Sequence, residues 1–275
     1  MHCVCMNSGT QSASPSMRLE VDAVTVRFGG ITALDAVSFC VPRGAIVGVI
    51  GPNGAGKTTL FNVICGFTRA RSGRLLLDGA VVRPVPHHLP RLGIARTLQG
   101  LGLFPGLTVV ENVMTGARPG RRTHALPGLM ALPRTDRRER EDRAAAMAAL
   151  ERLHLADVAG ASPDSLPYAV AKRVALARAL VARPRLLLLD EPAGGLGGDD
   201  ISELAALLRT LPGDGGGDTS VVLVEHHVDL VMAVCDSVVV LDFGKVIGSG
   251  RPDEVRDDPA VIEAYLGADI TRDAS

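Results

Sequence analysis

Long apolar runs are missing from this sequence of 275 residues. No stretch approaches the ~18 consecutive apolar residues that a membrane-spanning helix needs. The most apolar segments, residues 185–190 and 220–225, each end in an acidic residue. We therefore expect any contact with a membrane to be made through a partner protein.

An excess of positive charge is missing as well. The 29 basic and 30 acidic side chains give a formal net charge of -1, which removes the broad positive field on which sequence-independent nucleic-acid binding depends. Hydrophobic residues make up 47% of the chain and charged residues 21%, as in ordinary globular proteins. We expect a folded protein with no nucleic-acid partner.

Paired cysteines are the third absence. The five cysteines are odd in number and scattered, without metal-ligand spacing, which is typical of reduced thiols in a cytoplasm. Residues 1–16 are polar, without periodicity and without the apolar segment of a secretory signal. We expect a disordered extension there, with Met17 as a second candidate start, one main domain over residues 17–270, and a short tail at 271–275.

Strands and helices are predicted to alternate along most of the chain. Residues 19–26 and 31–41 are expected to form an antiparallel pair around a glycine turn. Nearly continuous apolar runs predict strands that are buried on both faces, and helical patterns lie between them. The runs span residues 45–50, 186–189, 221–224 and 238–241, and the helices are expected at 57–66, 199–210 and 228–234.

The middle of the chain has a different pattern. Helices are predicted at residues 108–116, 136–154 and 169–182 without a strand between them, and 118–133 is expected to be a loop or short lid. The predicted fold class is therefore α/β: a parallel-sheet core with an N-terminal antiparallel β subdomain and an inserted α-helical subdomain at about 101–183.

A glycine-rich segment follows the first predicted buried strand and opens a helix. It fits the phosphate-loop pattern G-x-x-x-x-G-K-[ST]. Glycines let backbone N–H groups turn toward phosphate oxygens, and a helix N-terminus adds partial positive charge. Lys57 is expected to reach the β- and γ-phosphates, Thr58 to ligate Mg²⁺, and Thr59 to bond an inner phosphate. The segment consists of Gly51, Pro52, Asn53, Gly54, Ala55, Gly56, Lys57 and Thr58.

Acidic residues and a histidine follow two other buried strands. Asp190 and Glu191 come directly after residues 186–189, and ligands of parallel sheets gather at the carboxyl ends of strands. We expect Asp190 to hold Mg²⁺, directly or through water, and Glu191 to act as general base toward the attacking water. His226 follows the strand at 221–224 and is a candidate for a hydrogen bond to the γ-phosphate.

Taken together, these motifs resemble the nucleotide-binding subunits of ATP-binding cassette (ABC) transporters, from Met17 to about residue 269. The resemblance implies a P-loop NTPase (RecA-like) core. It implies that Phe28 stacks on adenine and that Gln99 touches Mg²⁺ and the water, on a loop that senses the membrane subunit. It also implies that two ATPase subunits pair head to tail, with each ATP between one phosphate loop and the partner's signature helix.

A narrower resemblance is to the ATPase subunits of branched-chain amino-acid importers. It lies in the strings at residues 27–30, 65–67, 96–99 and 259–267 and in the insertion after Met114. Urea-type importers and lipopolysaccharide exporters have closely related ATPases. The resemblance implies permease subunits as partners, a substrate-binding protein acting indirectly, and a place at the cytoplasmic face of the cell membrane.

The sequence departs from the family pattern at positions that the resemblance places in contact with a neighbouring subunit. The signature L-S-G-G-Q is replaced at residues 166–170, Gly197 stands where an Asp or Asn is usual, and His227 replaces an acid. We therefore expect a different, complete ATPase subunit as partner. The alternatives are a degenerate cassette that binds ATP and dimerises but hydrolyses poorly, and a soluble cassette protein of repair or translation.

Overall fold

The computed structural model describes residues 16–97, 100–117, 133–213 and 218–270. The chain divides into two compact units: Met1–Leu89 with Leu188–Ser275, and Pro90–Leu187. The expected extension at residues 1–16 lies almost wholly outside the described residues, as does the tail at 271–275. The predicted domain bounds therefore remain a prediction.

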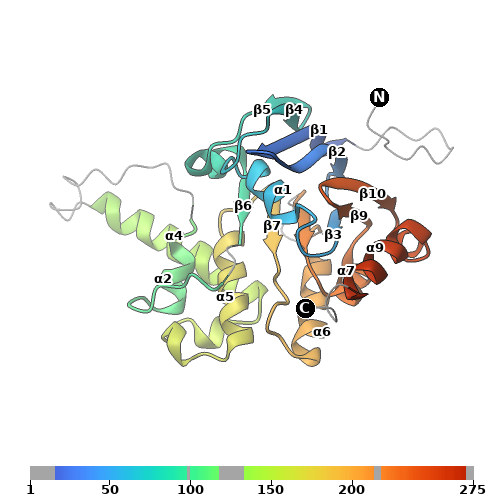
Figure 1. Ribbon diagram of the computed structural model, residues 1–275. Coiled ribbons are helices and arrows are strands. Elements are labelled where there is room, and N and C mark those ends of the chain that lie inside the picture. The colour runs from blue at the N-terminus through green and yellow to red at the C-terminus, as the bar shows by residue number, and fades with distance from the viewer. Residues whose placement is uncertain (1–15, 98–99, 118–132, 214–217, 271–275) are drawn as a thin grey trace. The chain divides into compact units, whose positions relative to one another are not determined.

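An antiparallel sheet forms one part of the first unit (Figure 1). Its strand order is β2-β1-β4-β5. Strands β1 (Met17–Phe28) and β2 (Ile31–Pro42) pair with Phe28 opposite Ile31, so Gly29 and Gly30 make the turn. This confirms the predicted pair. Two strands that the sequence analysis did not anticipate, β4 (Ser72–Leu77) and β5 (Ala80–Val82), complete the sheet.

The second sheet contains the predicted buried strands. Every residue of β3 (Ile46–Ile50), β7 (Leu186–Asp190) and β8 (Ser220–Val224) is buried, which explains their continuous apolar sequences. Strand β3 pairs in parallel with β8 and with β9 (Ser237–Asp242). The strand order is β10-β9-β3-β8-β7-β6, with β10 (Lys245–Gly250) antiparallel to β9 and β6 (Ile94–Arg96) at the other edge. The predicted α/β class is confirmed.

The first unit also contains five α-helices among its described residues. Helix α7 approaches strand β3 closely, because a Cβ on Gly48 would lie 2.6 Å from Val231 Cγ1 and 2.9 Å from Cys235 Sγ. Burial there raises the pKa of the Cys235 thiol to about 12, so the thiol stays protonated at neutral pH. The helices are α1 (Lys57–Ile64), α6 (Gly198–Thr210), α7 (Val228–Val234), α8 (Pro252–Arg256) and α9 (Pro259–Ile270).

Three of the five cysteines lie among the described residues. Among the residues that the structure describes, Cys40, Cys65 and Cys235 form no disulfide, and the last two are buried. Cys3 and Cys5 lie outside the described residues.

The second unit is mainly helical, as predicted. Its α-helices are α2 (Val109–Met114), α4 (Pro133–Arg152) and α5 (Tyr168–Leu180), with short 3-10 turns η2 (Ala156–Val158) and η3 (Pro163–Ser165). A further 3-10 helix, η1 (Pro86–Leu92), contains the boundary between the units. Helix α4 begins at Pro133, so the predicted start at residue 136 was wrong by three positions. The rest of the expected loop, residues 118–132, lies outside the described residues.

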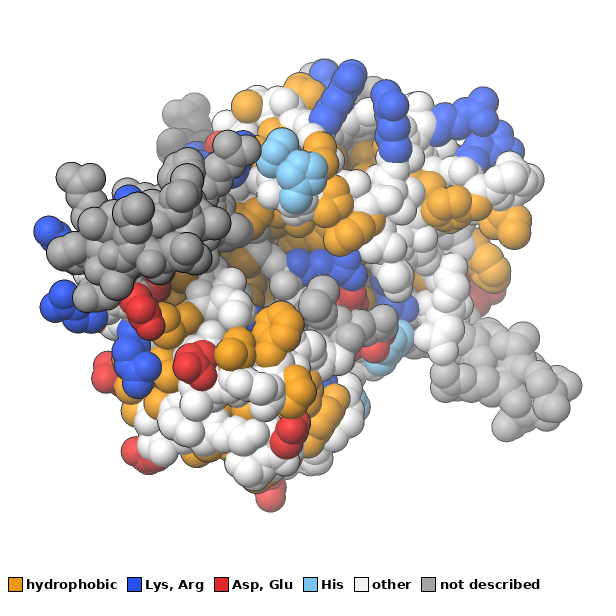
Figure 2. Space-filling view, turned by 90° about the vertical axis from the view of Figure 1, so that its left-hand side faces the viewer, with side chains coloured by type: hydrophobic (Ala, Val, Ile, Leu, Met, Phe, Trp, Pro, Cys, Tyr) orange, Lys and Arg blue, Asp and Glu red, His pale blue; other side chains and the backbone are white. Residues whose placement is uncertain are grey.

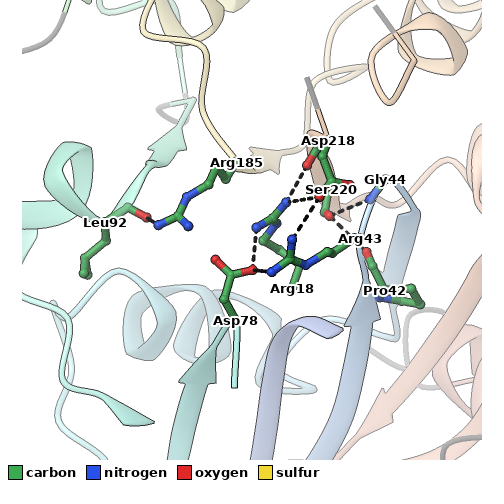
Figure 3. Close-up of polar contacts among 9 residues, drawn as sticks. All are labelled: Arg18, Pro42, Arg43, Gly44, Asp78, Leu92, Arg185, Asp218 and Ser220. Atoms are coloured by element: carbon green, nitrogen blue, oxygen red, sulfur yellow. Dashed lines mark hydrogen bonds and ion pairs between the residues drawn. The ribbon is translucent and has the colours of Figure 1, made fainter. Parts of the chain in front are cut away.

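A buried arginine joins the antiparallel sheet to the segment before β8 (Figure 3). Arg18 is 1% exposed and contacts Asp78 Oδ1 at 2.5 Å and Asp218 Oδ2 at 2.7 Å. It also donates to the Asp218 carbonyl oxygen at 2.7 Å. Arg43 contacts the same two carboxylates from the end of β2, at 2.8 and 3.4 Å. These contacts hold together four segments of the first unit that are distant in sequence.

Replacing Arg18 with methionine is expected to lower the free energy of unfolding by about 2–4 kcal/mol, because the change leaves two carboxylates without their buried partner. Arg74→Met is the matched control. Arg74 pairs with Asp22 at 2.8 Å but is 60% exposed, and such a pair contributes less than about 1 kcal/mol. Urea unfolding of both variants measures the difference, and equal losses would contradict a structural role for the buried pair.

The described surface is chemically mixed. Figure 2 shows hydrophobic, basic and acidic side chains interspersed on one face of the molecule. Within the described residues, no helix combines the length and the apolarity that crossing a membrane requires.

Candidate nucleotide site

The phosphate-loop segment lies between β3 and α1, as the sequence predicts. Its glycines have positive φ angles that disfavour other residues: 150° at Gly51, 84° at Gly54 and 102° at Gly56. A Cβ on Gly51 would come within 2.0 Å of the Leu241 carbonyl oxygen, and one on Gly56 would lie 2.7 Å from Ala33 O. The loop therefore needs glycine both for its backbone angles and for its close packing.

Lys57 is the first residue of α1 and is only 6% exposed. Its ammonium donates to the carbonyl oxygens of Gly51 at 2.6 Å and Pro52 at 2.9 Å, within its own loop. Burial lowers the pKa of Lys57, and the negative charge of Glu191 partly opposes that shift. Lys57 is thus held by the carbonyl oxygens of its own loop, and it interacts electrostatically with Glu191, the predicted general base.

The other predicted residues of the loop differ in their exposure. Ala55 is buried, Asn53, Gly54 and Thr58 are exposed, and Pro52, Gly56 and Thr59 are intermediate. Thr58 and Thr59 follow Lys57 in the first turn of α1. Phe28, the predicted adenine-stacking residue, ends β1 and is 53% exposed.

The turn between β9 and β10 supports the phosphate loop, and the sequence analysis did not identify it. Gly244 N–H donates to Ala55 O at 3.0 Å, and Asp35 N–H donates to Gly244 O at 2.8 Å. Gly244 has φ 77°, and a Cβ there would lie 2.6 Å from Ala33 O. The signal in the sequence was a glycine between two strand-like segments, next to Phe243, which is 85% exposed.

The acidic residues after β7 approach the histidine after β8. Asp190 ends β7 and is 4% exposed. Glu191 has a left-handed backbone, with φ 48°, and its N–H donates to Val224 O at 2.9 Å. Glu191 Oε1 lies 2.6 Å from His226 Nε2, with the two side chains 29% and 43% exposed. The structure therefore brings together the predicted general base and the histidine predicted to bond the γ-phosphate.

Glu225 is a further acidic residue at this place, which the sequence analysis treated only as the end of a strand. It is 1% exposed. Its carboxylate accepts hydrogen bonds from the backbone of Ala193 at 2.6 Å, His226 at 3.0 Å and His227 at 3.4 Å. An acid directly after four apolar strand residues, 221–224, was the available signal.

Not every predicted site residue is placed by the structure. Gln99 lies outside the described residues, so its predicted contact with Mg²⁺ and water stays a prediction. The segment at 166–170 belongs to the second compact unit. The phosphate loop, Asp190, Glu191 and His226 all belong to the first.

Comparison with known proteins decides the family. The family model described as ABC transporter matches residues 34–194, more than half of the chain. A second model, described as branched-chain amino acid ATP-binding cassette transporter, matches residues 245–271. The chain belongs to the ABC transporter ATP-binding family. It is therefore an ATP-binding protein and an ATPase, and the predicted P-loop NTPase fold is confirmed.

Relatives of this ABC protein share nearly its full length. It is 40% identical over 250 residues to BraF of Pseudomonas aeruginosa, a high-affinity branched-chain amino acid transport ATP-binding protein, covering 90% of this chain and 97% of BraF. It is 37% identical over 252 residues to LivG of Escherichia coli K12, a protein of the same description, with the same coverage. A solved ATP-binding cassette, MJ1267 in its ADP conformation, is 29% identical with a TM-score of 0.77 and covers 91% of this chain and 99% of that one.

The helix starts that depart from the ABC pattern lack side-chain caps. Helix α5 begins at Tyr168 after Pro167, and α6 begins at Gly198 after Gly197, neither with a side-chain hydrogen bond to its first turn. Asp or Asn at position 197 would supply such a cap, and serine at 167 would add a hydroxyl. Tyr168 is 47% exposed, with Lys172 Nζ 5.4 Å from its ring centroid.

Proposed function

We propose that this ABC protein is the ATP-binding and ATP-hydrolysing subunit of an importer for branched-chain amino acids. The observation that carries the substrate class is its 40% identity to BraF over 97% of that protein. The match of residues 245–271 to the branched-chain cassette model supports the same class. The pairing of Glu191 with His226 at 2.6 Å supports hydrolysis.

In this proposal the phosphate loop binds the triphosphate. Backbone N–H groups of residues 51 and 53–56 and the N-terminus of α1 face the phosphate oxygens. Lys57, which now contacts its own loop's carbonyl oxygens, turns its ammonium to the β- and γ-phosphates. Thr59 bonds an inner phosphate and Phe28 stacks on the adenine.

The donor set fits a magnesium ion. Thr58 offers a hydroxyl oxygen and Asp190 a carboxylate at the end of β7, and both are the hard oxygen ligands that Mg²⁺ prefers. Gln99 is the third proposed contact. When bound, Mg²⁺ neutralises charge that develops on the phosphate oxygens.

The hydrolytic step uses Glu191 as general base. Glu191 takes a proton from the attacking water as its oxygen bonds to the γ-phosphorus. The bond between that phosphorus and the β–γ bridging oxygen breaks, its electron pair stays with ADP, and inorganic phosphate is released. His226 holds the γ-phosphate by a hydrogen bond and, through Glu191 Oε1, keeps the base oriented.

The proposed assembly places this chain at the cytoplasmic face of the cell membrane, bound to permease subunits. A substrate-binding protein outside the membrane selects the cargo and reaches this chain only indirectly. We also propose that the second ATPase subunit is a different chain, because the uncapped start of α5 lacks the serine and glycines that face a partner's nucleotide. The same segment favours the second candidate, a cassette that binds ATP but hydrolyses it poorly.

The substrate proposal is tested by transport. The membrane complex is purified through a tag on this chain and reconstituted into liposomes with its binding protein. ATP-dependent uptake of labelled leucine is expected, with competition by excess isoleucine or valine and none by urea. The substrate class would be contradicted if urea, but neither isoleucine nor valine, competed with uptake. It would also be contradicted if a complex that hydrolyses ATP took up no amino acid.

A further inference from the structure

Glu225 is a buried carboxylate among backbone amides. It is 1% exposed, and no basic side chain of the described residues forms an ion pair with it. Backbone N–H donors instead satisfy its oxygens, and a buried polar group costs less free energy when its hydrogen bonds are made. This acidic residue stands directly after Val224, the last residue of strand β8.

The donors come from two different segments. Oε1 accepts from Ala193, two residues after Glu191, at 2.6 Å. Oε2 accepts from His226 at 3.0 Å and more weakly from His227 at 3.4 Å. One carboxylate thus connects the turn that carries the general base with the segment that carries the histidine.

The Glu191 turn requires such support. A non-glycine residue at φ 48° is strained by about 1–2 kcal/mol. Three hydrogen bonds are among those that hold the turn: Glu191 N–H to Val224 O at 2.9 Å, Gly194 N–H to Glu191 O at 3.1 Å, and the bond from Ala193 to Glu225. Glu225 supplies the only one of the three that comes from a side chain.

We propose that Glu225 is a positioning residue for ATP hydrolysis: its carboxylate fixes the Glu191 turn against the His226 backbone and so maintains the 2.6 Å Glu191–His226 contact. The inference rests on the proposed function, in which Glu191 and His226 act at the γ-phosphate. It assigns Glu225 no contact with nucleotide or water.

Two variants test the length and the charge of the Glu225 side chain separately. Glu225→Gln keeps the length but places an NH₂ group against backbone donors, so only one segment is held. Glu225→Asp keeps the charge but is shorter by about 1.5 Å, so it cannot accept from both segments. Glu263→Gln, a change at an exposed acid of α9, is the matched control.

The measurements are ATP turnover of the reconstituted transporter, thermal unfolding, and MgATP affinity of the purified chain. Both Glu225 variants are expected to lower kcat by ~10- to 100-fold, the loss typical of a catalytic group displaced by about 1 Å. KM for ATP and MgATP affinity should change less than ~3-fold, since the phosphate loop is untouched. Glu263→Gln should behave as wild type.

The outcomes distinguish this inference from the proposed function. Glu191→Gln is assayed in the same preparation: if it loses turnover while both Glu225 variants keep theirs, the positioning role is wrong and the proposed function stands. If Glu191→Gln keeps full turnover, the proposed base is wrong. Full recovery by Glu225→Asp, parallel losses of affinity and kcat, or failure of both variants to fold would show that Glu225 has a structural role only.

Discussion

Replacing Glu191 with glutamine is expected to lower ATP turnover of the assembled transporter by ~10²- to 10⁴-fold, the range typical of losing a general base. The amide keeps the size of the side chain and a hydrogen bond to His226, but it cannot take a proton from water. Glu191 Oε1 and His226 Nε2 are 2.6 Å apart, so the substitution changes basicity with little change of packing. Phosphate release by the reconstituted complex at saturating MgATP measures the loss.

MgATP binding is the internal control for this variant. Burial lowers the pKa of Lys57, and loss of the Glu191 charge removes an interaction that partly opposes that lowering, but the loop's own donors remain. Affinity is therefore expected to stay near that of wild type. An unchanged turnover number would remove Glu191 from the mechanism.

Replacing Lys57 with alanine is expected to nearly silence turnover in a transporter that pairs this chain with a different ATPase subunit. The site that uses this chain's phosphate loop also uses the partner's complete signature, so it performs most of the hydrolysis. The other site uses residues 166–170 of this chain, where α5 starts without a side-chain cap. Loss of one preorganised donor to developing phosphate charge costs ~10²- to 10³-fold.

The comparison variant changes the corresponding lysine of the partner subunit. Its complex is expected to retain a substantial fraction of turnover, because the fast site is intact. Equal losses from the two lysine changes, or full activity of a complex containing two copies of this chain, would overturn the proposed asymmetry.

The buried core was predictable from sequence because its strands bury both faces. Strands β3, β7 and β8 are apolar at nearly every position, a pattern that is typical of strands covered on both faces of a sheet. Strands β4 and β10 were missed because they contain glycine, charged or polar residues and are partly exposed. Their formation depends on pairing with β1 and β9, and the local sequence does not show that pairing.

The phosphate loop was predictable because binding phosphate requires particular residue types, glycines and a lysine, at a defined spacing. The turn that supports it was not, since the packing of Gly244 against Ala33 connects residues about two hundred positions apart. Glu225 was missed for a related reason. An acidic residue after a strand is usually exposed to solvent, and only the fold shows the three backbone N–H groups that donate to this one. The capping box of α2, in which Thr108 Oγ1 accepts from Glu111 N–H at 3.4 Å, follows a pattern visible in the sequence and was overlooked.

The most direct test of the account is calorimetric titration of the purified chain with MgATP, comparing wild type with Lys57→Ala. Arg256→Ala, which removes one positive charge from a side chain that is 70% exposed, is the control for net charge. Wild type and the control are expected to bind MgATP saturably. Lys57→Ala is expected to show no detectable binding, because the Lys57 ammonium neutralises charge on the β- and γ-phosphates. Equal affinity in wild type and Lys57→Ala would contradict nucleotide binding at this loop.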